Sequence, residues 1–214
     1  MKDTISIVIA TYGDENWRKL ALERALPSAE NQDVDDIVVF HEEYGTAASC
    51  RNKGISKAKG NWIIICDADD ELEPGYAAAM RKGLGDLRYP RVRYVPGIQI
   101  PEPVILGKKN LLLGNYMVIG TMFKKVLFQL VGGFGEFKTW EDWFLFMQMT
   151  YLGAVPMLVH DAIYRIYQHT GSRVSVPNPG QVFQEMLFQF KEWAFEYNGG
   201  ESKCRQYDGF LHGG

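Results

Sequence analysis

Apolar residues fall into short, regularly spaced runs along the first part of the chain. The runs at residues 37–40 and 62–66 are continuous, and Ser6 alone interrupts the run at residues 5–9; such runs are typical of strands in a parallel sheet. Between them, over residues 17–28 and 47–58, apolar side chains recur every three or four positions, which predicts helices. This alternation predicts an α/β fold, with a mostly parallel central sheet flanked by helices and right-handed crossovers.

The second half of the chain has a less regular pattern, and residues 88–109 combine prolines with short extended runs. Beyond them the pattern predicts a strand at 116–123, a helix at 124–131, a helix at 140–152, strands at 155–159 and 163–167, and a helix at 181–197. Neither an internal repeat nor a low-complexity linker divides the sequence. We therefore expect one domain over residues 1–200, with halves at 1–87 and 88–200, followed by a loose tail at 201–214.

Composition narrows the class of protein. The chain has 214 residues, 46% of them hydrophobic, which is enough to bury a full core. A net charge of −3 without a basic block disfavours nucleic-acid binding, although it does not exclude a local basic groove. We expect no transmembrane segment, because no apolar run approaches the roughly 20 residues of a membrane helix, and no signal peptide. Three cysteines without a paired spacing fit a cytoplasmic protein.

The end of the third predicted strand carries the clearest chemical signal. Residues 62–66 are apolar, and Asp67, Asp69, Asp70 and Glu71 follow at once. Such carboxylates would emerge at the carboxyl edge of the sheet, where open α/β folds bind ligands. Crowded acids repel one another unless a cation lies among them. The four acids therefore predict a site for a divalent metal ion that would also bind a phosphate group. The alternative is a solvated loop that caps the next helix.

Four further residues carry candidate chemistry. Glu141 and Asp142 lie between two tryptophans at a predicted helix start, where burial would raise the pKa of a carboxyl group toward that of a useful base. The alternative is that both acids only complement the helix N-terminus. Arg51 lies on the predicted helix before the third strand, where it would reach a pyrophosphate or simply face solvent. His169 follows the last predicted strand as a candidate ligand.

Taken in order, these segments resemble a glycosyltransferase of the GT-A fold, family 2. The resemblance covers about residues 4–175. The matching segments are Ile9-Ala10-Thr11-Tyr12, Ala47 to Gly54 with its Arg51-Asn52 pair, Cys66-Asp67-Ala68-Asp69-Asp70, and Gly132-Gly133-Phe134 followed by Glu141-Asp142. Four motifs in the right order and spacing make the resemblance specific, where each alone would be weak.

The resemblance implies an inverting transferase of the hexosyltransferase type. Its donor would be a nucleotide diphosphosugar, with a UDP-sugar favoured, bound by residues 1–87. Its acceptor, on the side of residues 88–200, would be a hydroxyl of a glycan, of a lipid-linked or protein substrate, or of another molecule. The cofactor would be Mn²⁺ or Mg²⁺, held by Asp70, with Asp69 and His169 as further candidate ligands.

The resemblance also implies roles for the other site residues. The donor-binding residues would be Thr11, Tyr12, Glu42, Glu43, Arg51, Asp67 and Asp69. Among them, Arg51 would assist the phosphates, Asp69 would face the ribose, and Asp67 would support the loop. The family usually has Asp-Asp-Gly-Ser after the second strand, so the acid that binds the base is left open between Glu42 and Glu43. Asp142, beside Glu141, would be the catalytic base that deprotonates the acceptor hydroxyl.

Three other functions stay open at this point. A non-catalytic module that binds a sugar nucleotide or glycan would use the same scaffold, but it would have no need of Asp142 as a base. A nucleotidyltransferase would want a Gly-rich, Arg-bearing loop after the first strand, where this chain has Thr11-Tyr12-Gly13-Asp14-Glu15. A transferase that acts on a DNA base is disfavoured by the net charge of −3.

Overall fold

The computed structural model describes residues 3–96, 111, 114–137, 139–168 and 178–199. The chain divides into two compact units, residues 1–172 and 173–214. The second unit contains the helix α7 (Pro179–Tyr197), as the apolar periodicity predicted. The boundary between the units falls inside the range predicted as one domain, and that single-domain assignment stays a prediction. Among the described helices, none is both long and apolar enough to cross a membrane.

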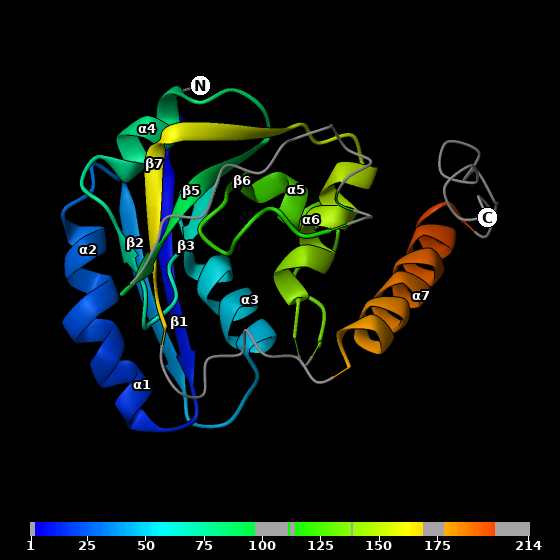
Figure 1. Cartoon of the computed structure of the whole chain (residues 1–214), viewed down its shortest axis with the longest axis horizontal. Coiled ribbons are helices and arrows are strands. Elements are labelled where there is room, and N and C mark those ends of the chain that lie inside the picture. The colour runs from blue at the N-terminus through cyan, green and yellow to red at the C-terminus, as the bar shows by residue number, and fades with distance from the viewer. Residues whose placement is uncertain (1–2, 97–110, 112–113, 138, 169–177, 200–214) are drawn as a thin grey trace. The chain divides into compact units, whose positions relative to one another are not determined.

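A seven-stranded mixed sheet lies at the centre of the first unit, in the order β2-β1-β3-β6-β5-β7-β4 (Figure 1). The strands are β1 (Ile5–Tyr12), β2 (Asp36–Glu42), β3 (Trp62–Ile65), β4 (Glu71–Leu72), β5 (Leu87–Val95), β6 (Met122–Lys124) and β7 (Pro156–Tyr167). Strand β1 pairs in parallel with β2 and β3, and β5 pairs in parallel with β7. Only β6 and β4 run antiparallel to their neighbours. The predicted α/β fold with a mostly parallel sheet is confirmed.

Helices cover both faces of this sheet. They are α1 (Glu15–Leu20), the π-helical turn η1 (Ala21–Ala25), α2 (Leu26–Glu30), α3 (Ala47–Lys57), α4 (Tyr76–Lys82), α5 (Lys125–Leu130) and α6 (Glu141–Tyr151). Strands β2 and β3 lie on opposite sides of β1, so right-handed crossovers place α1–α2 and α3 on opposite faces. Figure 1 shows this arrangement, with α1 and α2 on one side of the sheet and α3 and α6 on the other.

The continuous apolar run of β3 follows from this covering on both faces. Ile63, Ile64 and Ile65 are fully buried. Consecutive buried residues are expected in a strand whose two faces are both covered by helices. Helix α3 approaches β1 closely at Gly54, where an added Cβ would lie 2.7 Å from the Val8 side chain. The tight contact fixes α3, and with it every residue that α3 directs toward the carboxyl edge of the sheet.

The second half of the unit departs from the predicted elements in two ways. The strand expected at 116–123 is limited to β6, and the two strands expected at 155–159 and 163–167 form the single strand β7. The pairing of β5 with β7 is irregular between Pro90 and Arg91. Proline lacks the N–H that a ladder needs, so a bulge is where a strand tolerates it. This is why a strand forms inside the proline-containing stretch.

Candidate active site

The carboxyl ends of β1 and β2 bring the first predicted donor residues together. The two strands are in register, with Thr11 opposite His41 and Tyr12 opposite Glu42. The Thr11 hydroxyl and His41 Nδ1 share a hydrogen bond of 2.8 Å. His41 was not predicted as a site residue. The pairing register of β1 and β2 places His41 directly across from Thr11. Only knowledge of this register could have identified His41.

The two acids left open as base-binding residues have different surroundings. Glu42 accepts a hydrogen bond from Lys53 Nζ at 2.5 Å and lies 3.5 Å from Cys50 Sγ. The Lys53 hydrogen bond holds the pKa of Glu42 below its ordinary value. Glu43 is exposed in the turn that follows β2. Helix α3 therefore holds Glu42 ionised at the edge of the sheet, and the choice between the two acids stays open.

Residues 67–70, which we name the acid loop, form a turn after β3, closed by a hydrogen bond from the Asp70 N–H to the Asp67 carbonyl (3.1 Å). The Asp67 N–H donates to the Tyr164 hydroxyl at 3.0 Å, and Asp70 Oδ1 accepts from the Tyr167 N–H at 3.1 Å. Asp70 is buried, whereas Asp67 and Asp69 are partly accessible. Burial, followed by the charges of Asp67 and Asp69, raises the pKa of Asp70 to about 8. Asp70 therefore resists ionisation in this buried position, and a cation beside it would favour its ionised form.

Glu71, which was predicted to emerge with the other acids, lies outside the acid loop. It begins β4 and pairs with Arg165 of β7. Its Oε2 accepts hydrogen bonds from the Tyr167 hydroxyl at 2.7 Å and from Arg165 at 3.3 Å. The chain turns back after Asp70, so Glu71 belongs to the edge of the sheet.

The acid loop fits a metal ion that is shared with a substrate. Within the part of the chain that the structure describes, no three His, Cys, Asp or Glu side chains are arranged to hold a metal by themselves. Mg²⁺ is usually bound by one or two carboxylates together with substrate phosphates. The crowded pair Asp69 and Asp70 is a donor set of that kind. His169, the third predicted ligand, lies outside the described residues.

Arg51 connects the acid loop to the start of α6. It is buried in α3, where Nη2 donates to Asp67 Oδ1 at 2.7 Å and Nη1 donates to the carboxylate of Glu141. Although burial opposes its charge, Asp67 and Glu141 raise the pKa of Arg51 above its ordinary value. Both ends of the guanidinium therefore face protein carboxylates. The contact with donor phosphates that the sequence predicts for Arg51 stays a prediction.

Asn52, the next residue of α3, holds the turn that contains Gly133 and Phe134. Its Nδ2 donates to the Phe134 carbonyl at 3.0 Å, and its Oδ1 accepts from the Phe134 N–H at 2.8 Å. Gly133 has φ +87°, and an added Cβ would lie 2.8 Å from Asn52 Oδ1. Sequence reasoning noted this glycine and asparagine as separate motifs, and the structure shows that they form one contact.

Asp142 lies in the first turn of α6, directly after Glu141. Its Oδ1 accepts the N–H of Trp143 at 2.7 Å. Burial and then the charge of Glu141 raise the pKa of Asp142 to about 7, against the opposing charge of Arg51. The helix is entered through Trp140 at φ 63°, a strained conformation of the kind that clusters at functional sites. A carboxylate with a pKa near 7 is suited to accept a proton at neutral pH.

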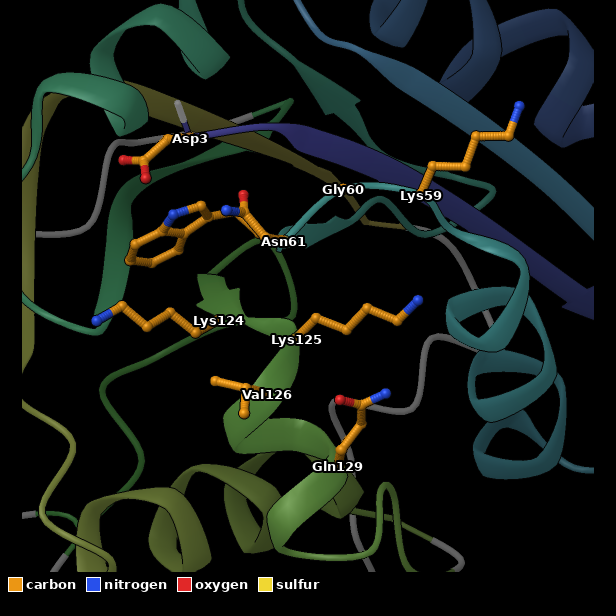
Figure 2. Close-up of a pocket in the computed structure, with 9 residues that line it drawn as sticks. Asp3, Lys59, Gly60, Asn61, Lys124, Lys125, Val126 and Gln129 are labelled. Atoms are coloured by element: carbon orange, nitrogen blue, oxygen red, sulfur yellow. The ribbon is translucent and has the colours of Figure 1, made fainter. Parts of the chain in front are cut away.

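A hollow of about 430 Å³ lies at the opposite edge of the sheet, around Trp62, at the amino end of β3. Lys59, Lys124 and Lys125 line it, and Figure 2 shows Lys124 pointing to one side and Lys59 and Lys125 to the other. Lys124 Nζ donates to Asp86 at 2.6 Å. The hollow is therefore separate from the candidate site, and its lysines do not converge on one point.

Part of the chain matches a known family and a curated protein in sequence. Residues 27–89 match the family model "Glycosyl transferase family 2", a range that includes Arg51 and the acid loop. The curated protein "Putative glycosyltransferase EpsH" of Bacillus subtilis (strain 168) is 28% identical over 109 aligned residues, which cover 38% of this chain and 30% of that protein.

Structural comparison extends the likeness to nearly the whole chain. The structure of S. aureus TarS 1–349 in complex with UDP-GlcNAc has a TM-score of 0.66 at 18% identity, over 90% of this chain and 66% of that one. The complex of TarS 1–349 with UDP has a TM-score of 0.59 at 17% identity, over 99% and 75%. The chain spans less than a third of the length of EpsH and about two thirds of the TarS fragment. The chain therefore has the GT-A fold seen in the TarS structures, and its residues 27–89 match the model of glycosyl transferase family 2.

Proposed function

We propose that this chain transfers a sugar from a nucleotide diphosphosugar to an acceptor hydroxyl. One observation carries the proposal: a single buried side chain, Arg51, binds Asp67 of the acid loop and Glu141, the neighbour of Asp142. The arrangement puts a carboxylate with a raised pKa next to an acid-rich loop at the carboxyl edge of the sheet. A UDP-sugar is the favoured donor, because the similar TarS structures hold UDP-GlcNAc and UDP.

On the donor side, Thr11, Tyr12 and one of Glu42 and Glu43 bind the base and ribose. Asp69 and Asp70 would hold Mn²⁺ or Mg²⁺, and the ion would supply the Lewis acidity that stabilises a departing diphosphate. Asp67, fixed by Arg51 and Tyr164, supports the loop that presents these two carboxylates. Burial and crowding raise the pKa of Asp70 to about 8, so a bound cation would take the place of its proton.

On the acceptor side, Asp142 removes the proton from the incoming hydroxyl. Its Oδ1 is oriented by the Trp143 N–H, so Oδ2 is the atom that we assign to the proton. A single carboxylate that activates the acceptor, with a leaving group on the opposite side of the sugar, gives direct displacement with inversion at the anomeric carbon. Glu141 acts through Arg51, which holds the first turn of α6 against the donor side.

The rival function is a binding module without catalysis. Binding alone has no use for a carboxylate whose pKa is raised to about 7, so this feature of Asp142 favours the transferase. A cytoplasmic location belongs to the same proposal, since Cys50 and Cys66 are buried free thiols, as is usual in a reducing compartment.

A thermal-shift panel of nucleotide sugars with and without Mn²⁺ tests the proposal. We expect at least one UDP-sugar to raise the melting temperature only when Mn²⁺ is present, because the ion held by Asp70 would bind the donor's phosphates. In the Asp70→Ala variant the shift should disappear. If no nucleotide sugar raises the melting temperature of the wild-type chain under either condition, the proposed donor site is wrong.

A further inference from the structure

Three polar side chains at four-residue spacing face the segment that contains the acid loop. Arg24, Ser28 and Gln32 lie along η1, α2 and the turn after it, so they share one helix face. Arg24 Nη1 donates a hydrogen bond to the Asp69 carbonyl at 2.8 Å. Ser28 Oγ accepts one from the Leu72 N–H at 3.2 Å, and Gln32 Nε2 donates one to the Glu73 carbonyl at 3.1 Å. This polar row therefore fixes the backbone of residues 69–73 from one side.

Arg24 differs from the other two members because it also contacts the far side of the loop. Its guanidinium lies 4.1 Å from the centroid of the Tyr167 ring, a distance typical of a cation–π contact. The Tyr167 N–H in turn donates to Asp70 Oδ1 at 3.1 Å. Arg24 thus contacts the backbone of Asp69 and the residue that orients the carboxylate of Asp70.

The π-helical turn η1 explains how the side chain arrives there. Arg24 lies within η1, between α1 and α2. A π turn inserts an extra residue into a helix, changes the direction of the side chains around it, and is frequent at functional sites. The apolar spacing of residues 17–28 predicts a helix but gives no sign of this turn, so sequence reasoning had no reason to select Arg24.

We infer that Arg24 is a positioning residue for the donor side of the site: through the Asp69 carbonyl and the Tyr167 ring it sets the direction in which Asp69 and Asp70 present their carboxylates. The inference rests on the proposed function. Ser28 and Gln32 bind residues 72 and 73, beyond the acid loop. Loss of Arg24 therefore loosens the loop at Asp69, while the contacts of Asp67 and Asp70 and the attachment of β4 stay in place.

Steady-state kinetics of Arg24→Met test the inference, with Arg81→Met as the matched control. Arg81 is another partly buried arginine that donates to a backbone carbonyl, that of Asp33 at 2.9 Å. We expect Arg24→Met to raise both the KM for the UDP-sugar and the Mn²⁺ concentration for half-maximal rate roughly 10- to 100-fold. The KM for the acceptor should not change. Arg24→Lys, which keeps the charge but not the planar fork, should recover part of the loss, and Arg81→Met should behave as the wild type.

Hydrogen–deuterium exchange provides a readout that does not depend on turnover. In Arg24→Met, the amides of residues 68–70 should exchange faster, while those of α3 should not change. The inference is overturned if loop exchange is unaltered, or if the KM values for donor and acceptor rise together with a lower melting temperature, as a merely structural role requires. A wild-type chain that binds no nucleotide sugar contradicts the proposed function instead, and the exchange experiment still decides the role of Arg24.

Discussion

Arg51 donates a hydrogen bond to Glu141, a residue 90 positions away in the sequence, while its other guanidinium nitrogen binds Asp67. One buried side chain thus joins the loop assigned to the metal with the helix assigned to the base. Since Asn52 binds Phe134 from the same turn of α3, the acceptor side is fixed to α3 at two adjacent points. The relative placing of Asp70 and Asp142 therefore depends on α3.

Replacement of Arg51 should cost much more than replacement of a surface arginine. Arg51→Met leaves the buried carboxylate of Glu141 without its partner, and such a loss typically costs about 3–5 kcal/mol. Urea unfolding measures the effect, with Arg18→Met as the control because Arg18 pairs with Glu15 at the surface. The double variant Arg51→Met/Glu141→Gln should recover part of the stability. A loss below about 1 kcal/mol, as in an exposed pair, would show that the bridge is not formed.

The glycine pair before Phe134 allows a cleaner test of the α3 contact. Gly132 and Gly133 have nearly the same φ, +86° and +87°, but only at Gly133 would an added Cβ meet Asn52, at 2.8 Å. Gly132→Ala therefore reports backbone strain alone, on the order of 1 kcal/mol. We expect Gly133→Ala to cost clearly more, and the excess to shrink in an Asn52→Ala background. Equal losses for the two alanine variants, by chemical denaturation, would contradict the contact.

The rate should depend on pH through Asp142. Its pKa is raised to about 7, and only the ionised carboxylate accepts a proton. We therefore expect kcat/KM to rise about tenfold per pH unit below pH 7 and to level off above it. A profile measured between pH 5 and 9 with saturating Mn²⁺ checks this. A rate that is constant down to pH 5 would mean that no group with this pKa acts as the base.

Stability in the absence of metal should depend on pH through Asp70. Its folded-state pKa of about 8 lies above the ordinary 3.8, so between these values the folded chain binds the extra proton, and stability falls as pH rises. Asp70→Asn removes this dependence. The variant should be more stable than the wild type at pH 9, with a gain that disappears toward pH 4, although it loses Mn²⁺-dependent donor binding. Lower stability of Asp70→Asn at pH 9 would contradict the assigned environment.

The sequence predicts the fold well where buried residues form a regular apolar pattern along the chain. Strands β1 and β3 are largely buried, so their apolar pattern marks them clearly. Strand β2 lies at the edge of the sheet and is only partly buried, but its apolar run is still visible in the sequence. Strand β7 reads as two strands because exposed His160 and Asp161 interrupt its apolar residues. Strand β5 is concealed by Pro90, which lies at a bulge.

The candidate site is predictable only as a set of residue types. The acids after β3 are visible in the sequence, but the return of the chain into β4, which removes Glu71 from the set, depends on pairing with distant β7. The partners of Arg51 and Arg24 are equally non-local, at separations of 90 and 45 positions. Spacing along one segment does not encode such contacts, so the positioning residues are found only in three dimensions.

The central claim is that Asp142 is the base of a metal-dependent transfer from a UDP-sugar. Its most direct test is the Mn²⁺-dependent release of UDP from the donor by the wild type and by Asp142→Asn, with donor affinity measured on the same samples. We predict equal donor affinity and a rate that is roughly 10²- to 10⁴-fold lower in the variant. Release of UDP by Asp142→Asn at the wild-type rate would contradict the account.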